Sequence, residues 1–288
     1  MACAVVLALS VGCGAGDEGR DAETADPAGG DGRAAEAAGE TGVAADPEDG
    51  DGGFVASGTT SGGEAGAAGR IEDVRFRVLD GYERLLVEFG GGDAGVPRWS
   101  VERPEEGGYV RLRLPGVAAT AVAHEEFVGS VLDELYVVRD RDGGLFVDVF
   151  AMHGFRYRVT EPSESGRLVV DFRGVAEEVR LPPTTGDEVA VLQPREAEEV
   201  ESPIDVRGYA RPSRDRITVS LLDRERDVVA SKVVRTDDSG EAWGLFETTL
   251  GFSGYEGLAT LRVGGRGAGG GPFAGTETEV FLESSGPG

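Results

Sequence analysis

The sequence has few of the cysteine and histidine side chains that commonly perform nucleophilic, redox or metal chemistry. The chain has two cysteines and two histidines among its 288 residues. Cys3 and Cys13 both precede the long part of the chain, which therefore has no thiol for catalysis, for a disulfide or for a zinc site. His124 lacks the second histidine of a zinc metalloprotease motif. His124 and His153 share a metal only if the fold brings them together, and no third ligand stands out, so we predict no metal.

Other patterns associated with catalysis or nucleotide binding are incomplete. Ser253, in the run Gly251–Gly254, does not lie in a G-x-S-x-G motif. The glycine-rich run Gly264–Gly271 has no Lys-Ser or Lys-Thr end and therefore does not resemble a phosphate-binding loop. A carboxylate pair for glycoside hydrolysis stays open, because nothing singles out two of the 53 acids. We predict a protein that is not an enzyme and has no cofactor.

The charge of the chain disfavours two classes of partner. It carries 28 basic and 53 acidic residues, a net charge of −25 at pH 7. Binding to nucleic acid requires a basic surface that neutralises phosphates, so no nucleic-acid partner is expected. Electrostatic attachment to an anionic membrane face is disfavoured for the same reason.

An acidic segment of low complexity occupies residues 14–69. It consists mostly of Gly, Ala, Asp, Glu, Ser, Thr and Pro, and its only larger apolar side chains are Val43, Phe54 and Val55. Such a composition cannot offset the loss of backbone entropy on folding, and like charges extend the chain. We predict that residues 14–69 form a disordered, acidic, Gly/Ala-rich tether.

A short apolar run ends at Cys13, immediately before this tether. Ala4–Leu9 is too short to span a bilayer, which needs about 20 apolar residues. The segment Leu9-Ser10-Val11-Gly12-Cys13 resembles the lipobox of bacterial lipoproteins. The resemblance implies a signal peptide over residues 1–13 and lipid attachment at Cys13. The protein would then be anchored to the outer face of the bacterial cytoplasmic membrane, in the cell envelope.

Alternating apolar and polar residues begin at Ile71 and predict a first β-sandwich over residues 70–174. Val74, Phe76 and Val78 alternate with arginines, and the same period of two recurs in several later segments. About seven short strands with glycine and proline between them favour a sandwich. Residues 118–128 are expected to form one short helix.

A second β unit is predicted over residues 189–285, after a linker at 175–188 that contains Pro182-Pro183. Seven short strands in this length favour an immunoglobulin-like sandwich, although the sequence lacks the Cys-Trp-Cys signature of antibody domains. The predicted fold class is thus all-β, with two sandwiches after a disordered acidic linker.

The second unit resembles the immunoglobulin-like domain of bacterial spore germination. The resemblance rests on Ser202-Pro203-Ile204-Asp205-Val206-Arg207-Gly208-Tyr209-Ala210 and on Trp243-Gly244-Leu245-Phe246. Trp243 and Phe246 are the largest apolar side chains available to that unit, so we expect both in its core.

The first unit resembles the AMIN-like domain of bacterial envelope proteins, through Tyr82–Phe89, Phe155–Val159 and Arg167–Phe172. Members of the broader AMIN class position cell-wall amidases or secretin assemblies and contact peptidoglycan. This resemblance implies a binding or positioning module and supplies no catalytic residue.

Arginines on the polar faces of the first unit are weak candidates for a ligand-binding surface. Arg75, Arg77, Arg111 and Arg113 would converge if their strands shared one sheet. Guanidinium groups suit the carboxylates and phosphates of peptidoglycan and anionic wall polymers. Ordinary pairing with acids on neighbouring strands is the alternative.

These inferences predict a non-catalytic cell-envelope lipoprotein that binds or positions cell-wall components or partner proteins. Its expected partners are the membrane, through the lipid, and peptidoglycan, another wall polymer or envelope proteins. One alternative is a solute-binding lipoprotein with a pocket between its two domains. A less favoured alternative is a cryptic cell-wall hydrolase.

Overall fold

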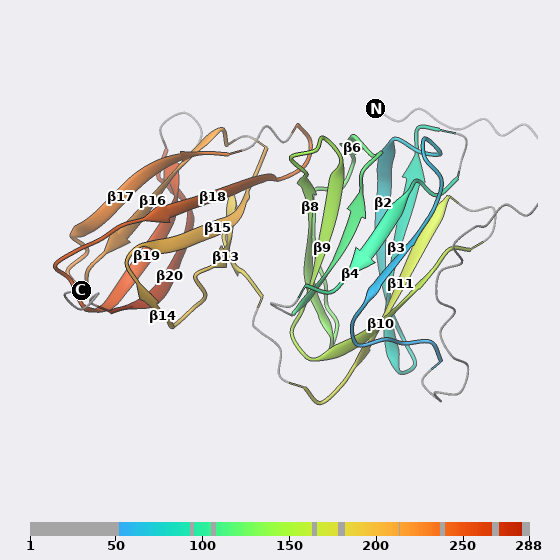
Figure 1. The fold of residues 1–288 in the computed structure, drawn as a ribbon, viewed down its shortest axis with the longest axis horizontal. Helices are drawn as coiled ribbons and strands as arrows, with labels where there is room; N and C mark the ends of the chain where they lie inside the picture. The colour runs from blue at the N-terminus through green and yellow to red at the C-terminus, as the bar shows by residue number, and fades with distance from the viewer. Residues whose placement is uncertain are drawn as a thin grey trace, which may run out of the picture. The chain divides into compact units, whose positions relative to one another are not determined.

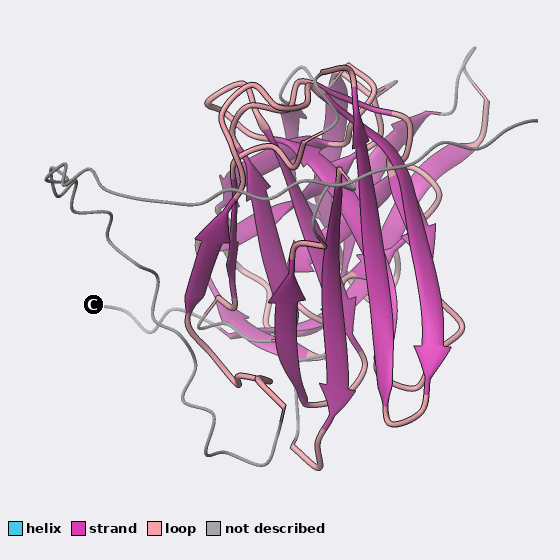
Figure 2. Ribbon diagram, turned by 90° about the vertical axis from the view of Figure 1, so that its right-hand side faces the viewer, coloured by secondary structure: helices cyan, strands magenta, loops and turns pink. Residues whose placement is uncertain are grey.

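The computed structural model describes residues 52–92, 95–104, 108–162, 166–177, 182–212, 214–236, 240–266 and 271–283, all in one compact unit. Within these ranges the chain forms twenty strands and no helix (Figures 1 and 2), which confirms the predicted all-β fold. A helix long and apolar enough to cross a membrane is therefore not found in this part of the chain. Cys13 and the N-terminal part of the predicted tether lie outside the described residues.

The first sandwich consists of two mainly antiparallel sheets. One sheet has the order β1 (Thr59–Gly62), β4 (Trp99–Glu102), β5 (Tyr109–Leu114), β9 (Leu145–Ala151), β8 (Leu132–Arg139), β7 (His124–Glu126). The other has the order β10 (Phe155–Thr160), β11 (Arg167–Gly174), β3 (Tyr82–Gly90), β2 (Arg70–Leu79), β6 (Ala119–Thr120). Alternate residues point inward, so Leu85 and Val87 from one sheet join Leu112 and Leu114 from the other in a single buried core.

The first sandwich begins before Arg70, which corrects the predicted end of the tether at Gly69. Phe54 is buried, and Val55 pairs its backbone with Tyr157. The guanidinium carbons of Arg158 and Arg173 lie 4.6 Å and 4.2 Å from the centre of the Phe54 ring. Strand β1 then extends the sheet by pairing with β4. The few apolar residues of this segment are enough to fold it onto the domain, because each one packs on a sheet formed by the rest of the domain.

Residues 118–128 form two short strands rather than the expected helix. Strand β6 runs parallel to β2, and β7 runs antiparallel to β8. The Thr120 hydroxyl donates to the carbonyl of Val122 at 2.5 Å and accepts from its amide at 3.1 Å. This local turn satisfies backbone groups without a helix, and the sheet edges supply the remaining partners.

A buried carboxylate holds the start of β8. Glu83 on β3 is 1% exposed, and it accepts hydrogen bonds from the amides of Ser130, Val131 and Leu132. The Ser130 hydroxyl donates a further bond at 3.0 Å. These donors compensate the burial of a charged group and fix the position at which β8 enters its sheet.

The second sandwich also has two sheets. One has the order β12 (Thr184–Thr185), β13 (Val189–Gln193), β15 (Ile204–Ala210), β18 (Gly244–Leu250). The other has the order β14 (Glu198–Glu201), β20 (Phe273–Glu283), β19 (Gly257–Arg266), β16 (Arg216–Leu222), β17 (Val228–Arg235). Val206, Val219, Phe246 and Leu261 belong to the core between them, so the expected place of Phe246 is confirmed.

Gly208 explains one position of the Ser202–Ala210 motif. A Cβ atom at Gly208 would lie 2.1 Å from the carbonyl oxygen of Ala190 and 2.6 Å from the Phe246 ring. Because Phe246 and the β13 backbone occupy that space, only glycine fits at this point of β15.

Candidate binding site between the two sandwiches

The two sandwiches share a buried aromatic cluster. The first contributes Tyr109, Tyr136, Val138, Phe146 and Phe150, and the second contributes Ala190, Leu192, Tyr209 and Trp243. Strand β9 is buried at every residue, since Leu145, Val147 and Val149 face the first core while Phe146 and Phe150 join this cluster. The outer face of the β5–β9–β8 sheet is therefore covered rather than exposed to solvent.

Trp243 lies in this shared cluster and not in the core of the second sandwich, which corrects the expectation from the sequence. It is 1% exposed, and its ring centre lies 4.9 Å from that of Tyr136 in an edge-to-face contact. Its backbone pairs with β8: the Trp243 amide donates to the Val137 carbonyl at 2.9 Å, and the Arg139 amide donates to the Trp243 carbonyl at 2.8 Å. The residue before it, Ala242, belongs to the core of the first sandwich.

A charged group is buried at the centre of the cluster. Asp148 on β9 is fully buried, and Arg111 on β5 donates to its two carboxylate oxygens at 2.8 Å and 2.6 Å. Tyr209 on β15 donates its hydroxyl proton to the same carboxylate, from the other sandwich. Burial raises the pKa of Tyr209 well above its usual value, and the charge of Asp148 raises it further. The tyrosine is therefore a proton donor here at any physiological pH.

Arg111 stays charged in spite of its burial. Desolvation alone would lower its pKa, but the hydrogen bonds and charge of Asp148 outweigh that effect and raise it. Its guanidinium carbon also lies 4.2 Å from the centre of the Phe146 ring. Arg111 and Asp148 thus neutralise each other at the junction of the sandwiches.

A second polar group in the cluster surrounds Glu134 on β8. Tyr136 and Thr185 donate hydroxyl hydrogen bonds to the Glu134 carboxylate at 2.7 Å and 3.0 Å. The Nε2 atom of His124 lies 3.1 Å from the same carboxylate, and the His124 ring stacks on that of Tyr136. His153, by contrast, is exposed. Across the described ranges no group of His, Cys, Asp and Glu side chains is arranged to hold a metal ion.

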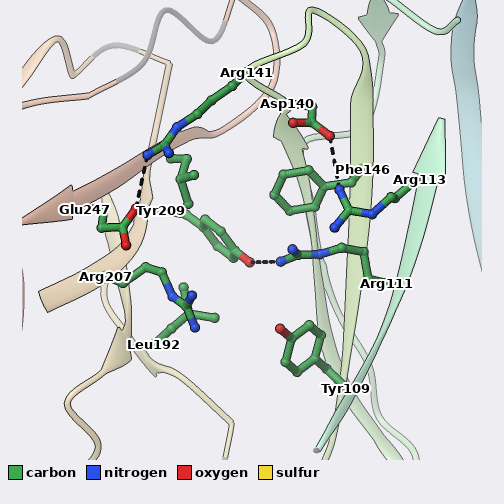
Figure 3. A pocket seen from close by; sticks show the side chains of 11 residues that line it. Tyr109, Arg111, Arg113, Asp140, Arg141, Phe146, Leu192, Arg207, Tyr209 and Glu247 are labelled. Atoms are coloured by element: carbon green, nitrogen blue, oxygen red, sulfur yellow. Dashed lines mark hydrogen bonds and ion pairs between the residues drawn. The ribbon is translucent and has the colours of Figure 1, made fainter. Parts of the chain in front are cut away.

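A pocket of about 260 Å³ opens beside Asp148 and Arg111, between the two sandwiches (Figure 3). Four arginines line it: Arg111 and Arg113 on β5, Arg141 in the β8–β9 turn, and Arg207 on β15. Asp140 and Glu247 are its acids, and its apolar lining includes Tyr109, Phe146, Leu192, Tyr209 and Leu245. The lining is thus richer in positive than in negative groups, in a chain of net charge −25.

Ion pairs at the rim of the pocket are more exposed than the inner one. Arg141 Nη2 lies 3.2 Å from Glu247 Oε2, with 59% and 54% of the two side chains exposed. Arg113 lies 3.0 Å from Glu102 and 3.3 Å from Asp140. Because solvent screens such pairs, they contribute little to stability, about 0–1 kcal/mol each.

The four arginines singled out in the sequence do not share a face. Arg75 and Arg77 lie on β2, in the β10–β11–β3–β2–β6 sheet, whereas Arg111 and Arg113 lie on β5, in the opposite sheet. Arg75 pairs with Asp73 at 2.8 Å and with Glu88 at 3.2 Å. The structure brings Arg111 and Arg113 together with two arginines that the sequence did not single out.

Cross-strand pairing accounts for other arginines of the first sandwich. Arg84 and Arg158 donate to the carboxylate of Asp171, at 2.7 Å to Oδ1 and 2.6 Å to Oδ2 respectively. Burial by itself would raise the pKa of Asp171, but these hydrogen bonds hold it below its usual value. On this face of the sheet, acids on neighbouring strands therefore neutralise the arginines, which was the alternative to a ligand-binding surface.

The sequence does not assign Arg141, Arg207 or Tyr209 to a site, and Asp148 and Phe146 are missed altogether as site residues. The run Leu145–Ala151 carries the signal that would have found their position, because it is apolar on both faces except for Asp148. A strand of this composition is covered on both sides, and an isolated sandwich covers only one.

Comparison with known protein families agrees with this architecture for the second sandwich. Residues 188–271 match the immunoglobulin-like domain of bacterial spore germination. The match confirms the resemblance found in the Ser202–Ala210 and Trp243–Phe246 motifs. No curated protein and no solved structure matches the chain. The AMIN-like resemblance of the first sandwich and the lipobox stay predictions.

Proposed function

We propose that this protein is a non-catalytic lipoprotein of the bacterial cell envelope that binds or positions cell-wall components. Cys13 carries the lipid, and the acidic segment after it separates the folded part from the membrane surface. The two sandwiches then act as one positioning unit.

The observation that carries this proposal is the buried junction between the sandwiches. Trp243 pairs with β8, and Tyr209 donates to Asp148, so the spore-germination-type domain is joined to the first sandwich by backbone and side-chain bonds. The junction tolerates little relative motion, because a shift of the second sandwich would break the Tyr209–Asp148 hydrogen bond and leave a buried carboxylate short of a donor. Rigid spacing is what a positioning module requires.

The chemistry of the described residues supports a non-catalytic role. His124, whose type suits acid–base catalysis, is held by Glu134 and by stacking on Tyr136 inside the junction. Asp140 and Glu247, the acids of the pocket, are each paired with an arginine. The described lining of the pocket contains no histidine, and both of its acids face arginines.

Sedimentation with purified peptidoglycan tests the proposal. A chain that begins at Gly14, and so lacks the anchor, is expected to pellet with the polymer. Its binding should weaken as salt rises from about 50 to 500 mM, because exposed charge contacts are screened over about a Debye length. Replacing Arg75 and Arg77 by Gln tests whether the outer face of β2 contacts the peptidoglycan, and it leaves the junction residues unchanged. Protein that stays in the supernatant at about 50 mM salt contradicts wall binding.

The pocket favours a second candidate, a solute-binding lipoprotein. Its lining comes from both sandwiches, as that alternative requires. The lining is strongly charged, however, and a pocket of about 260 Å³ is smaller than the usual 300–1,000 Å³ or so of small-molecule sites. We therefore treat the pocket as a recognition site of the positioning module.

A further inference from the structure

The pocket separates into an inner and an outer set of arginines. Arg111 forms the inner set: it is 19% exposed and bound to both carboxylate oxygens of Asp148, so the protein itself satisfies it. Arg113 and Arg141 belong to the outer set, with side chains 41% and 59% exposed. Their contacts to Asp140 and Glu247, at 3.3 Å and 3.2 Å, are longer than those of Arg111.

Arg207 completes the outer set from the second sandwich. It lies on β15 directly across from Glu247 on β18, and it is half-buried. In Figure 3 its guanidinium group points into the space between the sandwiches, toward the side of Tyr109 and Arg111. Three cations from three separate elements, β5, the β8–β9 turn and β15, thus surround one opening.

The acids at the rim already show what these cations bind. Asp140 and Glu247 place carboxylates against Arg113 and Arg141; the Glu247 pair is exposed and the Asp140 pair is half-buried, and because solvent reaches both, each contributes little free energy. A carboxylate supplied by a ligand can replace either acid, which then turns into solvent at small cost. The planar guanidinium fork favours such an exchange, because it binds a carboxylate through two parallel hydrogen bonds.

The apolar lining of the pocket determines which groups can accompany the carboxylate of the ligand, and how large they can be. Tyr109, Phe146 and Leu192 present aromatic and aliphatic surface beside the cations. A volume of about 260 Å³ has room for one or two small residues inside the pocket. The charged end of the ligand therefore meets the arginines at the opening, and its small apolar groups pack on the aromatic lining.

We propose that this pocket binds the free carboxyl end of a short peptide, held by Arg113, Arg141 and Arg207 and packed on Tyr109 and Phe146. The proposal deepens the proposed wall-binding function, because peptide stems of the wall present such ends. Since Arg141 and Arg207 come from different sandwiches, bound peptide also ties the two together and should raise the melting temperature of the whole chain.

Calorimetric titration of the chain from Gly14 with N-acetyl-D-alanyl-D-alanine tests the proposal. The matched control ligand is the same dipeptide with a C-terminal amide, and glycerol 3-phosphate distinguishes a phosphate source of the anion. We expect the free acid to bind, and the amide to bind at least about tenfold more weakly, because hydrogen bonds to a charged group are lost. Equal binding of acid and amide, tighter binding of the phosphate, or no binding of the acid up to about 10 mM would each overturn the proposal.

Variants locate the site. Arg207→Gln and Arg141→Gln should each weaken binding of the acid about tenfold, and Arg207→Lys should restore only part of it because lysine lacks the fork. The double variant Arg75→Gln and Arg77→Gln removes the same kind of charge from the opposite sheet and should leave affinity within about twofold. Melting temperatures of the variants without ligand exclude unfolding as the cause. Wild-type affinity in Arg207→Gln would sink the assignment.

This titration and the wall sedimentation fail independently. Wall binding that survives Arg207→Gln would retain the proposed function and reject the pocket as its site. Dipeptide binding without wall sedimentation would retain the pocket and reject the wall as its partner.

Discussion

Trp243→Ala should disconnect the two sandwiches as well as destabilise them. Trp243 is 1% exposed, and its ring contacts side chains of the first sandwich, including Tyr136 and His124. Removing a buried tryptophan side chain costs about 3–5 kcal/mol, since the lost burial and the cavity left behind add together. This is a large part of the roughly 5–15 kcal/mol that keeps a typical protein folded.

The cost should fall on the junction, because that is where the ring lies. Trp99 and Trp243 are the two tryptophans of the chain, so in the variant the fluorescence reports on Trp99 in the first sandwich alone. Far-ultraviolet circular dichroism reports on both sandwiches. In urea, the two signals should change together for the wild type and should separate for Trp243→Ala, with a midpoint that moves to lower urea.

Phe246→Ala is the matched control. Phe246 is also 1% exposed and lies three residues along the same segment, but it belongs to the core of the second sandwich. Its loss should cost about as much, 3–5 kcal/mol or so, while the junction stays intact. If Trp243→Ala shifts the free energy of unfolding by less than about 1 kcal/mol, or leaves the two signals coincident, the reasoning about the junction is falsified.

Three further outcomes are expected. Asp171→Asn should lower the free energy of unfolding at pH 7 and make it depend less on pH in the acid range. The reason is that the lowered pKa of Asp171 adds stability above about pH 4, and this stability is lost as pH falls through the folded-state pKa. Equal acid unfolding of variant and wild type would contradict this. Tyr209→Phe should cost about 1.5–3 kcal/mol in thermal or urea unfolding, because buried Asp148 loses a hydrogen bond, and no change would remove Tyr209 from the junction. Cys13→Ser should release the protein from membranes and abolish labelling by radioactive palmitate, whereas unlabelled wild type would disprove lipidation.

The fold class could be predicted from the sequence because most strands have one solvent face. Strand β3 alternates along its whole length, so Leu85, Val87 and Phe89 identified it without any knowledge of its neighbours. The Gly208 and Phe246 motif likewise depends on contacts within one sandwich. Patterns of this kind record local burial, and local burial is what a period of two reveals.

The junction could not be predicted in the same way, because it depends on which faces meet. The sequence predicts that Trp243 is buried, but a large aromatic side chain is buried equally well in the core of the second sandwich and in the junction. Its choice of β8 over its own core follows from backbone pairing with Val137 and Arg139, which no pattern in 240–246 records. The same limit applies to Phe54, whose burial depends on contacts with Arg158, Arg173 and Tyr82, all distant in the sequence.

The buried charges at the junction favour a fixed arrangement more than they favour stability. Removing Arg111 and Asp148 from water costs several kcal/mol for each ion, and their attraction roughly compensates that cost. An aromatic cluster alone tolerates sliding, because stacked and edge-to-face contacts have similar energies over a range of offsets. Asp148 receives its Arg111 hydrogen bonds within the first sandwich, but it gains its further donor only where the Tyr209 hydroxyl of the second sandwich meets it. Any other placement of the second sandwich leaves a buried carboxylate short of donors, so the charges select one register, and that register is the one that forms the arginine-lined pocket.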